Sequence, residues 1–225
     1  MRTAWIVTTI ALLTAAPSWA QTERGYITGV GGLTTSPDAT SGDVLAEAGI
    51  RIAPHLLVFG DLGEFHNLQP SDVQPAVNST TALLSANQGL NVLGTARTPA
   101  WYSLGGLRYE IPKQYHVFPY VLGGAGVARL MPTGQFTYAS GPVPDGSSPA
   151  LGADVTSQLV TAGDFTAPPD TTAFMFTLGG GVEFPVAAHW AVDAGYRFSR
   201  IAADTPLSAS PLTTNGMTFG IGYRF

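Results

Sequence analysis

The last ten residues, GMTFGIGYRF at positions 216–225, alternate large apolar side chains with small or polar ones. Successive side chains of a β-strand point to opposite faces, so this period of two predicts a strand with one apolar face and one polar face. Glycine, threonine and Arg224 form most of the polar face. The apolar face carries Met217, Phe219, Ile221, Tyr223 and Phe225.

Seven earlier stretches predict seven more strands, four with the same clear alternation and three, at 25–34, 55–65 and 116–130, with a weaker one. They lie at residues 25–34, 46–52, 55–65, 101–111, 116–130, 174–184 and 190–199. The links alternate in length, with short ones at 53–54, 112–115 and 185–188 and long ones at 35–43, 66–99, 131–171 and 202–215. An up-and-down sheet then gathers the short turns at one end and the long loops at the other, as outer-membrane barrels do. The predicted fold class is all-β, an eight-stranded antiparallel up-and-down transmembrane β-barrel with long loops at one end.

The two longest links differ in composition. Residues 131–171 are rich in proline, glycine, serine and threonine, which predicts a mobile loop. Residues 66–99 contain the apolar pieces 82–84 and 90–93. We expect these pieces either to extend strands above the membrane or to form a short packed element.

The polarity of the two strand faces favours a membrane barrel over a lipocalin-like soluble barrel, which is the alternative architecture. The apolar face is too bulky for the interior of an eight-stranded barrel, which is barely wide enough for side chains. We therefore expect the apolar face to contact lipid and the polar face to line the lumen. Ten charged residues, five of each sign, are predicted to form a paired network there: Glu47, Arg51, Asp61, Arg108, Glu110, Arg129, Glu183, Asp193, Arg197 and Arg224.

A short repeat of glycine, apolar, charged and apolar residues supports this arrangement. It ends each strand that runs toward the short turns, at residues 49–52, 106–109, 181–184 and 222–225. If its apolar residues face lipid, its glycine and its charge face inward, and glycine leaves room for neighbouring side chains in a narrow lumen.

Composition excludes several classes of function. Only 11% of the 225 residues are charged and none is cysteine, which excludes a disulfide scaffold, a cysteine-ligated metal and a thiol nucleophile. The isoelectric point near 5.2 argues against nucleic acid as a partner, because nucleic-acid binding needs a basic patch. No cofactor and no metal site are expected.

The first twenty residues have the layout of a secretory signal peptide. Arg2 precedes an apolar run that ends near Ala16, and Pro17-Ser-Trp-Ala20 resembles a cleavage site. An amino-terminal membrane anchor is the alternative, but the run is short for crossing the bilayer core. We therefore expect residues 1–20 to be removed and residues 21–225 to form one outer-membrane barrel.

The chain resembles the small OmpA-like, eight-stranded outer-membrane β-barrel proteins. The resemblance rests on the signal peptide, the strand PYVLGGAGV at 119–127 and the terminal GIGYRF at 220–225. It implies that Tyr223 and Phe225 belong to the signal read by the barrel-assembly machinery. It also implies outer-membrane lipids as surroundings and a monomer as the oligomeric state.

Three functions remain open at this point. The first is a structural or surface-interaction role, without a wide pore and without catalysis, for a partner that the sequence does not identify. The second is a narrow transporter of small hydrophobic molecules. The third is a lipid-modifying enzyme, for which His66, Ser71 and Asp72 would be a conceivable catalytic set.

Overall fold

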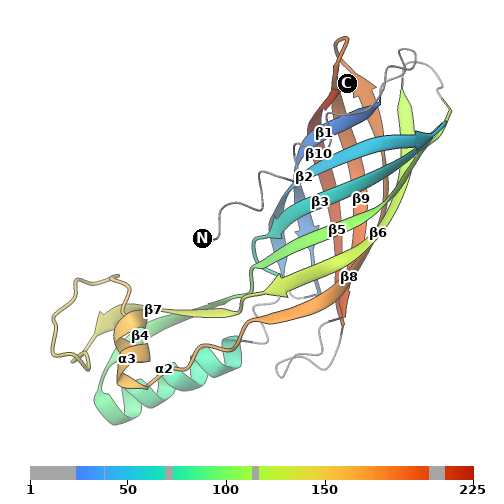
Figure 1. Cartoon of the computed structure of the whole chain (residues 1–225). Coiled ribbons are helices and arrows are strands. Elements are labelled where there is room, and N and C mark those ends of the chain that lie inside the picture. Colours follow the sequence, from blue (N-terminus) through green and yellow to red (C-terminus); the bar gives the residue numbers. More distant parts are fainter. Residues whose placement is uncertain (1–23, 38, 69–72, 113–116, 203–210) are drawn as a thin grey trace, which may run out of the picture.

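The computed structural model describes residues 24–37, 39–68, 73–112, 117–202 and 211–225. The predicted signal peptide lies outside this part of the chain. Eight strands close into one antiparallel barrel in the order β1-β10-β9-β8-β6-β5-β3-β2, as predicted (Figure 1). The barrel strands are β1 (Gly25–Thr35), β2 (Thr40–Ala53), β3 (Leu56–Phe65), β5 (Ala100–Glu110), β6 (Phe118–Leu130), β8 (Thr171–Pro185), β9 (Trp190–Ala202) and β10 (Leu212–Arg224).

The two faces of the barrel wall have the predicted polarity. On β10, the side chain of Phe219 is 63% exposed on the outside, whereas Arg224 is buried in the lumen. Closure pairs the first strand with the last, Tyr26 opposite Arg224, and so joins the two edges of the eight-stranded sheet. A closed sheet satisfies its backbone polar groups internally, which hydrocarbon surroundings require.

Glycines of the terminal repeat make room for aromatic side chains in the lumen. A Cβ atom on Gly49 would lie 2.4 Å from the ring of Tyr26, and one on Gly181 would lie 2.7 Å from the Tyr120 hydroxyl. Both tyrosines are buried. The lumen therefore holds aromatic residues as well as the expected glycines and charges.

The first link is shorter than the predicted 35–43. Strands β1 and β2 stay paired out to Thr35 and Thr40, which leaves only residues 36–39 between them. The inward alternation of β2 extends to Asp43 and Ser41, both buried, so the strand is longer than its apolar residues indicate. The strict alternation of short and long links consequently fails at this position.

The two longest links fold together into a unit that we call the side module, residues 73–97 and 133–165. It contains α2 (Gln74–Gln88), β4 (Asn91–Arg97), β7 (Thr133–Ser140) and α3 (Thr156–Ala162), with β4 and β7 forming a separate two-stranded sheet. Neither of these helices is long and apolar enough to cross a membrane in the described part of the chain. Figure 1 shows the side module beside the barrel, at the end away from the short turns.

A hydrophobic core of its own holds the side module together. Val77 and Leu84 from α2, Phe136 from β7 and Leu159 from α3 are all buried there. The ring of Phe165 meets that of Phe136 edge-on, with 4.9 Å between centroids. The prediction of a mobile loop over 131–171 is therefore wrong, because this link supplies half of a packed core. In the link 66–99, the apolar piece at 82–84 lies in the packed helix α2. The piece at 90–93 begins β4, which extends a barrel strand.

The sheet of the side module continues the barrel wall. Within the barrel Ala100 pairs with Leu130, and beyond it Arg97 pairs with Thr133 in the same register. The ladder is carried across the junction by the Met131 N–H, which donates to the Pro99 carbonyl at 2.9 Å. Each junction contains a proline, at 99 and at 132. Because proline lacks an N–H group, the regular strand pairing is interrupted there while the chain direction is kept.

A short hydrogen-bonded turn at residues 154–156 connects α3 to the sheet of the side module. The Thr156 N–H, at the start of α3, donates to the Asp154 carboxylate at 2.9 Å. Hydrogen bonds from Thr156 lower the pKa of Asp154. The other carboxylate oxygen accepts from Gln135 on β7 at 3.0 Å. Asp154 therefore ties α3 to the sheet at neutral pH.

Replacing Phe136 by alanine tests whether the side module is a packed unit separate from the barrel. Removing a buried phenylalanine costs about 3–5 kcal/mol, so the module should open and become sensitive to protease. The barrel should keep its heat-modifiable gel mobility. Leu83→Ala, which removes an exposed side chain from α2 of the same module, is the matched control and should leave protease resistance unchanged. Equal resistance in Phe136→Ala and the parent would contradict the packed module.

Candidate functional site: the ion network of the lumen

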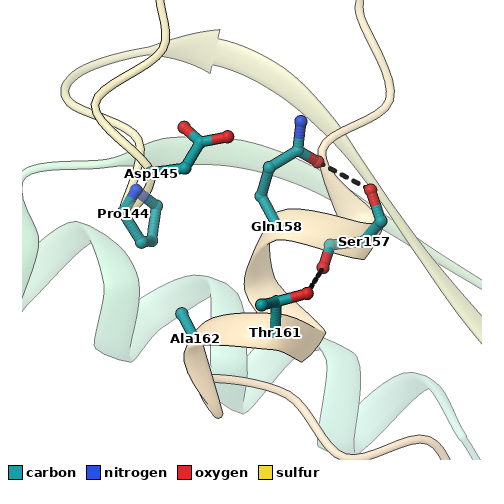
Figure 2. A pocket seen from close by; sticks show the side chains of 6 residues that line it. All are labelled: Pro144, Asp145, Ser157, Gln158, Thr161 and Ala162. Carbon is teal, nitrogen blue, oxygen red and sulfur yellow. Dashed lines mark hydrogen bonds between the residues drawn. The ribbon is translucent and has the colours of Figure 1, made fainter.

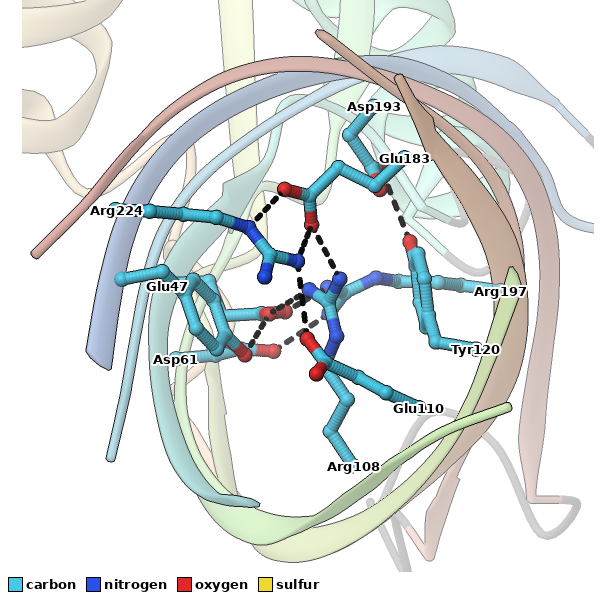
Figure 3. A network of polar contacts seen from close by, with 10 residues as sticks. Glu47, Asp61, Arg108, Glu110, Tyr120, Glu183, Asp193, Arg197 and Arg224 are labelled. Carbon is cyan, nitrogen blue, oxygen red and sulfur yellow. Dashed lines mark hydrogen bonds and ion pairs between the residues drawn. The ribbon is translucent and has the colours of Figure 1, made fainter. Parts of the chain in front are cut away.

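Eight charged side chains form one continuous chain through the lumen, with positive and negative groups in strict alternation. Figure 3 labels all of them except Arg51. In order along the chain they are Arg51, Glu110, Arg224, Glu183, Arg108, Glu47, Arg197 and Asp61. Four arginines thus meet four carboxylates, and this chain of eight side chains has no net charge.

The contacts at both ends of this chain are close. Arg51 lies 2.6 Å from Glu110, and Arg197 lies 2.5 Å from Asp61. Burying ions costs several kcal/mol each unless they are paired and hydrogen-bonded. Alternation meets that requirement, because every interior member of the chain contacts an opposite charge on each side.

The charges of the terminal repeat meet at one level of the barrel. Arg108 lies 2.6 Å from Glu183, and Arg224 also binds Glu183. Glu110 joins Arg224, at 2.9 Å, to Arg51. Because the four copies end strands that run in the same direction, the repeat places its four charges in one layer near the short turns.

Tyrosines complete the surroundings of Arg108. Its guanidinium lies 3.7 Å from the ring centroid of Tyr120 and 4.7 Å from that of Tyr26. The hydroxyl of Tyr26 donates to Glu47, and that of Tyr120 donates to Asp193 at 2.9 Å. Aromatic faces attract cations most strongly where water is excluded, so this buried arginine is held on two sides.

The expected balance of five charges of each sign is not observed. Arg129 points out of the barrel, where its side chain is 61% exposed and pairs with Asp170 at 2.7 Å. Its position on β6 shares a face with the outward Val121 and Val127, which accounts for this orientation. Asp193 lies in the lumen as predicted, but its partner is a tyrosine rather than an arginine.

Sequence reasoning missed several residues of the lumen. Asp43 is buried and accepts a hydrogen bond from Tyr102 at 3.3 Å. It shares the alternation of Glu47 and Arg51 along β2, so continuing the strand by a few residues would have identified it. Tyr26, Tyr102 and Tyr120 were missed for another reason, because large aromatic residues were assigned to the outer face.

An apolar layer closes the lumen at the end of the long links. Its members come from the ends of five strands of the barrel. They include Phe65, Leu130, Met175, Ile201 and Leu212, all buried. Between this layer and the ion network lies a hollow of about 10 Å³, lined in part by Asp43, Thr177 and Ser199. That is about the space that one water molecule occupies.

At the opposite end lie the terminal residues, together with His55 and His189. Tyr223 and Phe225 point outward, at 40% and 49% exposure. The His189 ring contacts the Arg224 carbonyl at 3.1 Å, and His55 lies in the β2–β3 turn with a φ of 67°. The sequence offers His66, Ser71 and Asp72 as a conceivable catalytic set. Two of them, Ser71 and Asp72, lie outside the described residues. In the described part, no group of three or more His, Cys, Asp or Glu residues is placed to hold a metal ion.

An open pocket of about 390 Å³ lies on the side module. Figure 2 shows its lining residues, which are Pro144, Asp145, Ser157, Gln158, Thr161 and Ala162. Hydrogen bonds from Ser147 lower the pKa of Asp145. The Thr161 hydroxyl donates to the Ser157 carbonyl at 2.8 Å within α3. These polar groups are used by their own loop and helix, so the pocket identifies no ligand.

Comparison with known proteins agrees with this architecture. Residues 6–225 match the family described as outer membrane protein beta-barrel domain, and the chain belongs to that family of outer-membrane barrels. The comparison with curated proteins found no match.

Similar solved structures are also outer-membrane barrels. The chain is similar to Neisserial surface protein A, NspA, at 15% identity and a TM-score of 0.55, over 89% of this chain and 97% of that one. It also resembles Ail, the attachment invasion locus protein of Yersinia pestis, at 14% identity and a TM-score of 0.46, over 92% and 100%. For the outer membrane enzyme PagL the values are 10% and 0.41, over 87% and 97%. At these identities the likeness concerns the fold alone.

Substituting Arg197 tests the energetic weight of the network. Arg197→Ala leaves Glu47 and Asp61 without their shared cation, and breaking a buried ion pair costs about 3–5 kcal/mol. We expect a loss of that size in the free energy of unfolding, measured by urea titration of the folded gel band in lipid vesicles. Adding Asp61→Ala should recover part of the loss, because it removes one of the stranded carboxylates.

Arg129→Ala is the control for this series. It breaks the exposed pair with Asp170, and exposed ion pairs contribute about 0–1 kcal/mol. Equal losses for Arg197→Ala and Arg129→Ala would show that the lumen chain has no special role in stability.

Proposed function

We propose that this outer-membrane protein has a structural and surface-interaction role, in which the barrel anchors the side module at the cell surface without forming a wide pore or catalysing a reaction. The observation that carries the proposal is the combination of a filled lumen with a folded unit outside it. The long links, where the sequence predicts a surface partner, form the side module, so we expect that partner to bind there.

The contents of the lumen support the absence of a wide pore. The neutral chain of eight charges occupies the barrel near the short turns, and the apolar layer around Ile201 and Met175 occupies the other end. Eight-stranded barrels have interiors just wide enough for side chains, in contrast to porins with 16–18 strands. A continuous aqueous path would have to displace both layers.

The packing of the side module supports a role in surface contact. A mobile loop loses conformational entropy when it binds, whereas a folded unit offers a preformed surface. Outer-membrane barrels place short turns in the periplasm and long connections outside the cell. By that rule α2, β4, β7 and α3 face the surroundings of the cell.

Conductance across a planar lipid bilayer tests the closed lumen. The purified monomer should give no steady conductance of the size of a porin channel, because ions would have to cross the apolar layer. Arg129→Ala, which changes an outward charge, should behave like the parent chain. A steady open level from the parent protein would overturn the closed-barrel part of the proposal.

The absence of native cysteine gives a direct test of surface display. Leu83→Cys places a thiol at an exposed position of α2, and Ala187→Cys places one at the short turn between β8 and β9. In intact cells, a membrane-impermeant maleimide should label the first variant and leave the second unlabelled until the outer membrane is permeabilised. The reverse pattern would place the side module in the periplasm and contradict surface display.

A further inference from the structure

The sheet of the side module has one covered face and one open face. Val92 and Phe136 point to the covered face, and a Cβ on Gly94 would lie 2.3 Å from Val77 of α2. The alternate residues of β4 and β7 point to the opposite face of the sheet and are exposed or half-buried. We call this the open face, and it carries Leu93, Thr95 and Arg97 from β4 and Thr133, Gln135 and Thr137 from β7.

The open face continues the lipid-facing surface of the barrel. The register across β4–β7 is that of β5–β6, so the alternation of faces passes through the junction without a slip. Odd-numbered residues therefore point outward on both sides of it. Trp101 and Leu107 on β5, and Val127 on β6, are about half exposed on the wall that faces the bilayer, at 55%, 50% and 51%.

The direction of the side module turns this open face toward the membrane. Figure 1 shows the β4–β7 ribbon leaving the barrel sideways, with α2 on the side farther from the barrel. Because α2 covers one face of the ribbon, the open face is the one directed back toward the bilayer surface. The module thus extends over the membrane beside the barrel instead of standing above the lumen.

The composition along this continuous surface follows the layers of a bilayer surface. The apolar wall ends at Trp101, and tryptophan is typical of the membrane interface. Arg129, paired across the ladder with Trp101, and Arg97 follow at the junction. Arginine binds phosphate oxygens through two parallel hydrogen bonds. Threonines come next, with Gln135 and the exposed Asp154 carboxylate that it binds, and then Leu93, whose side chain is 68% exposed.

We propose that the open face rests on the outer leaflet, with Arg97 contacting anionic lipid headgroups and Leu93 reaching into the interface, while Arg129 keeps its pair with Asp170. The partner is the lipid surface itself, recognised by a phosphate-binding arginine on the same face as an exposed apolar side chain. This inference depends on the outer-membrane position of the barrel, and it goes beyond the proposed role of the module in surface contact. The covered side of the module, where α2 lies, is left for any other partner.

Depth-dependent fluorescence quenching tests this contact. Leu93→Cys is labelled with an environment-sensitive fluorophore and reconstituted in vesicles of phosphatidylcholine and phosphatidylglycerol that include chain-brominated phosphatidylcholine. Leu83→Cys is the matched control, because it is the same residue type in the same module, 60% exposed, but on α2. We expect several-fold stronger quenching and a blue-shifted emission at position 93. Equal, weak quenching at both positions would overturn the proposal.

Substituting Arg97 gives a second readout, which tests the headgroup contact separately from the insertion of Leu93. Adding Arg97→Gln to labelled Leu93→Cys should reduce the quenching, and it should reduce it more with phosphatidylglycerol present than with phosphatidylcholine alone. Heat-modifiable mobility and protease resistance of the module establish that each variant is folded. If the quenching is the same with and without Arg97, the headgroup contact is wrong even where Leu93 is buried in lipid. Surface labelling at Leu83→Cys is unaffected by either result, so the two proposals fail separately.

Discussion

A barrel of eight strands has no room for bulk water beside the charges on its inner face. A charge there is stabilised when it pairs with an opposite charge from another strand, as eight of them do, and the order of strands determines which ones can meet. Arg224 on the last strand reaches both Glu110 and Glu183, and Arg197 reaches Glu47 and Asp61. These contacts join strands far apart in the sequence and cross the lumen. Closure of the sheet and pairing of the charges consequently stabilise one another.

The same alternation that fills the lumen also builds the surface outside the membrane. Strands β4 and β7 keep the register of β5 and β6 beyond the proline at each junction, so one face remains outward and the other turns toward α2. The face that would have continued the lumen becomes the core of the side module, around Phe136 and Val77. Pairing two links in this way requires no new fold, because the module begins as an extension of two barrel strands.

Much of the barrel follows from the sequence, because period two is a strong signal where one face meets lipid. It located all eight barrel strands and the inward direction of Glu47, Arg108 and Arg224. The period-two signal was weaker where the regular alternation of large and small side chains breaks down, as in β6. Arg129 lies on the outward parity of β6, but its charge was given more weight than its position, and the glycines at 123, 124 and 126 obscured the register.

Pairing between distant segments could not be predicted. Whether the links 66–99 and 131–171 meet depends on two segments that are each polar or rich in proline and glycine when taken alone. Their apolar residues, such as Leu84, Phe136 and Leu159, become a core only when β4 and β7 pair. The ion contacts have the same limitation, since the sequence shows that Glu183 points inward but not that both Arg108 and Arg224 reach it.

Because the lumen is filled and the module lies to one side, the groups that remain accessible to a partner are those on the outer surfaces. Four lumen arginines pair with four carboxylates, Asp43 and Asp193 accept from tyrosine hydroxyls, and the hollow near Asp43 has a volume of about 10 Å³. The exposed arginines Arg129 and Arg200 lie near the long-link ends of β6 and β9, and Arg97 lies at the end of β4 that is nearest to the barrel. The membrane surface is the partner that we propose for the open face of the module, and it leaves the side that carries α2 available for a second partner.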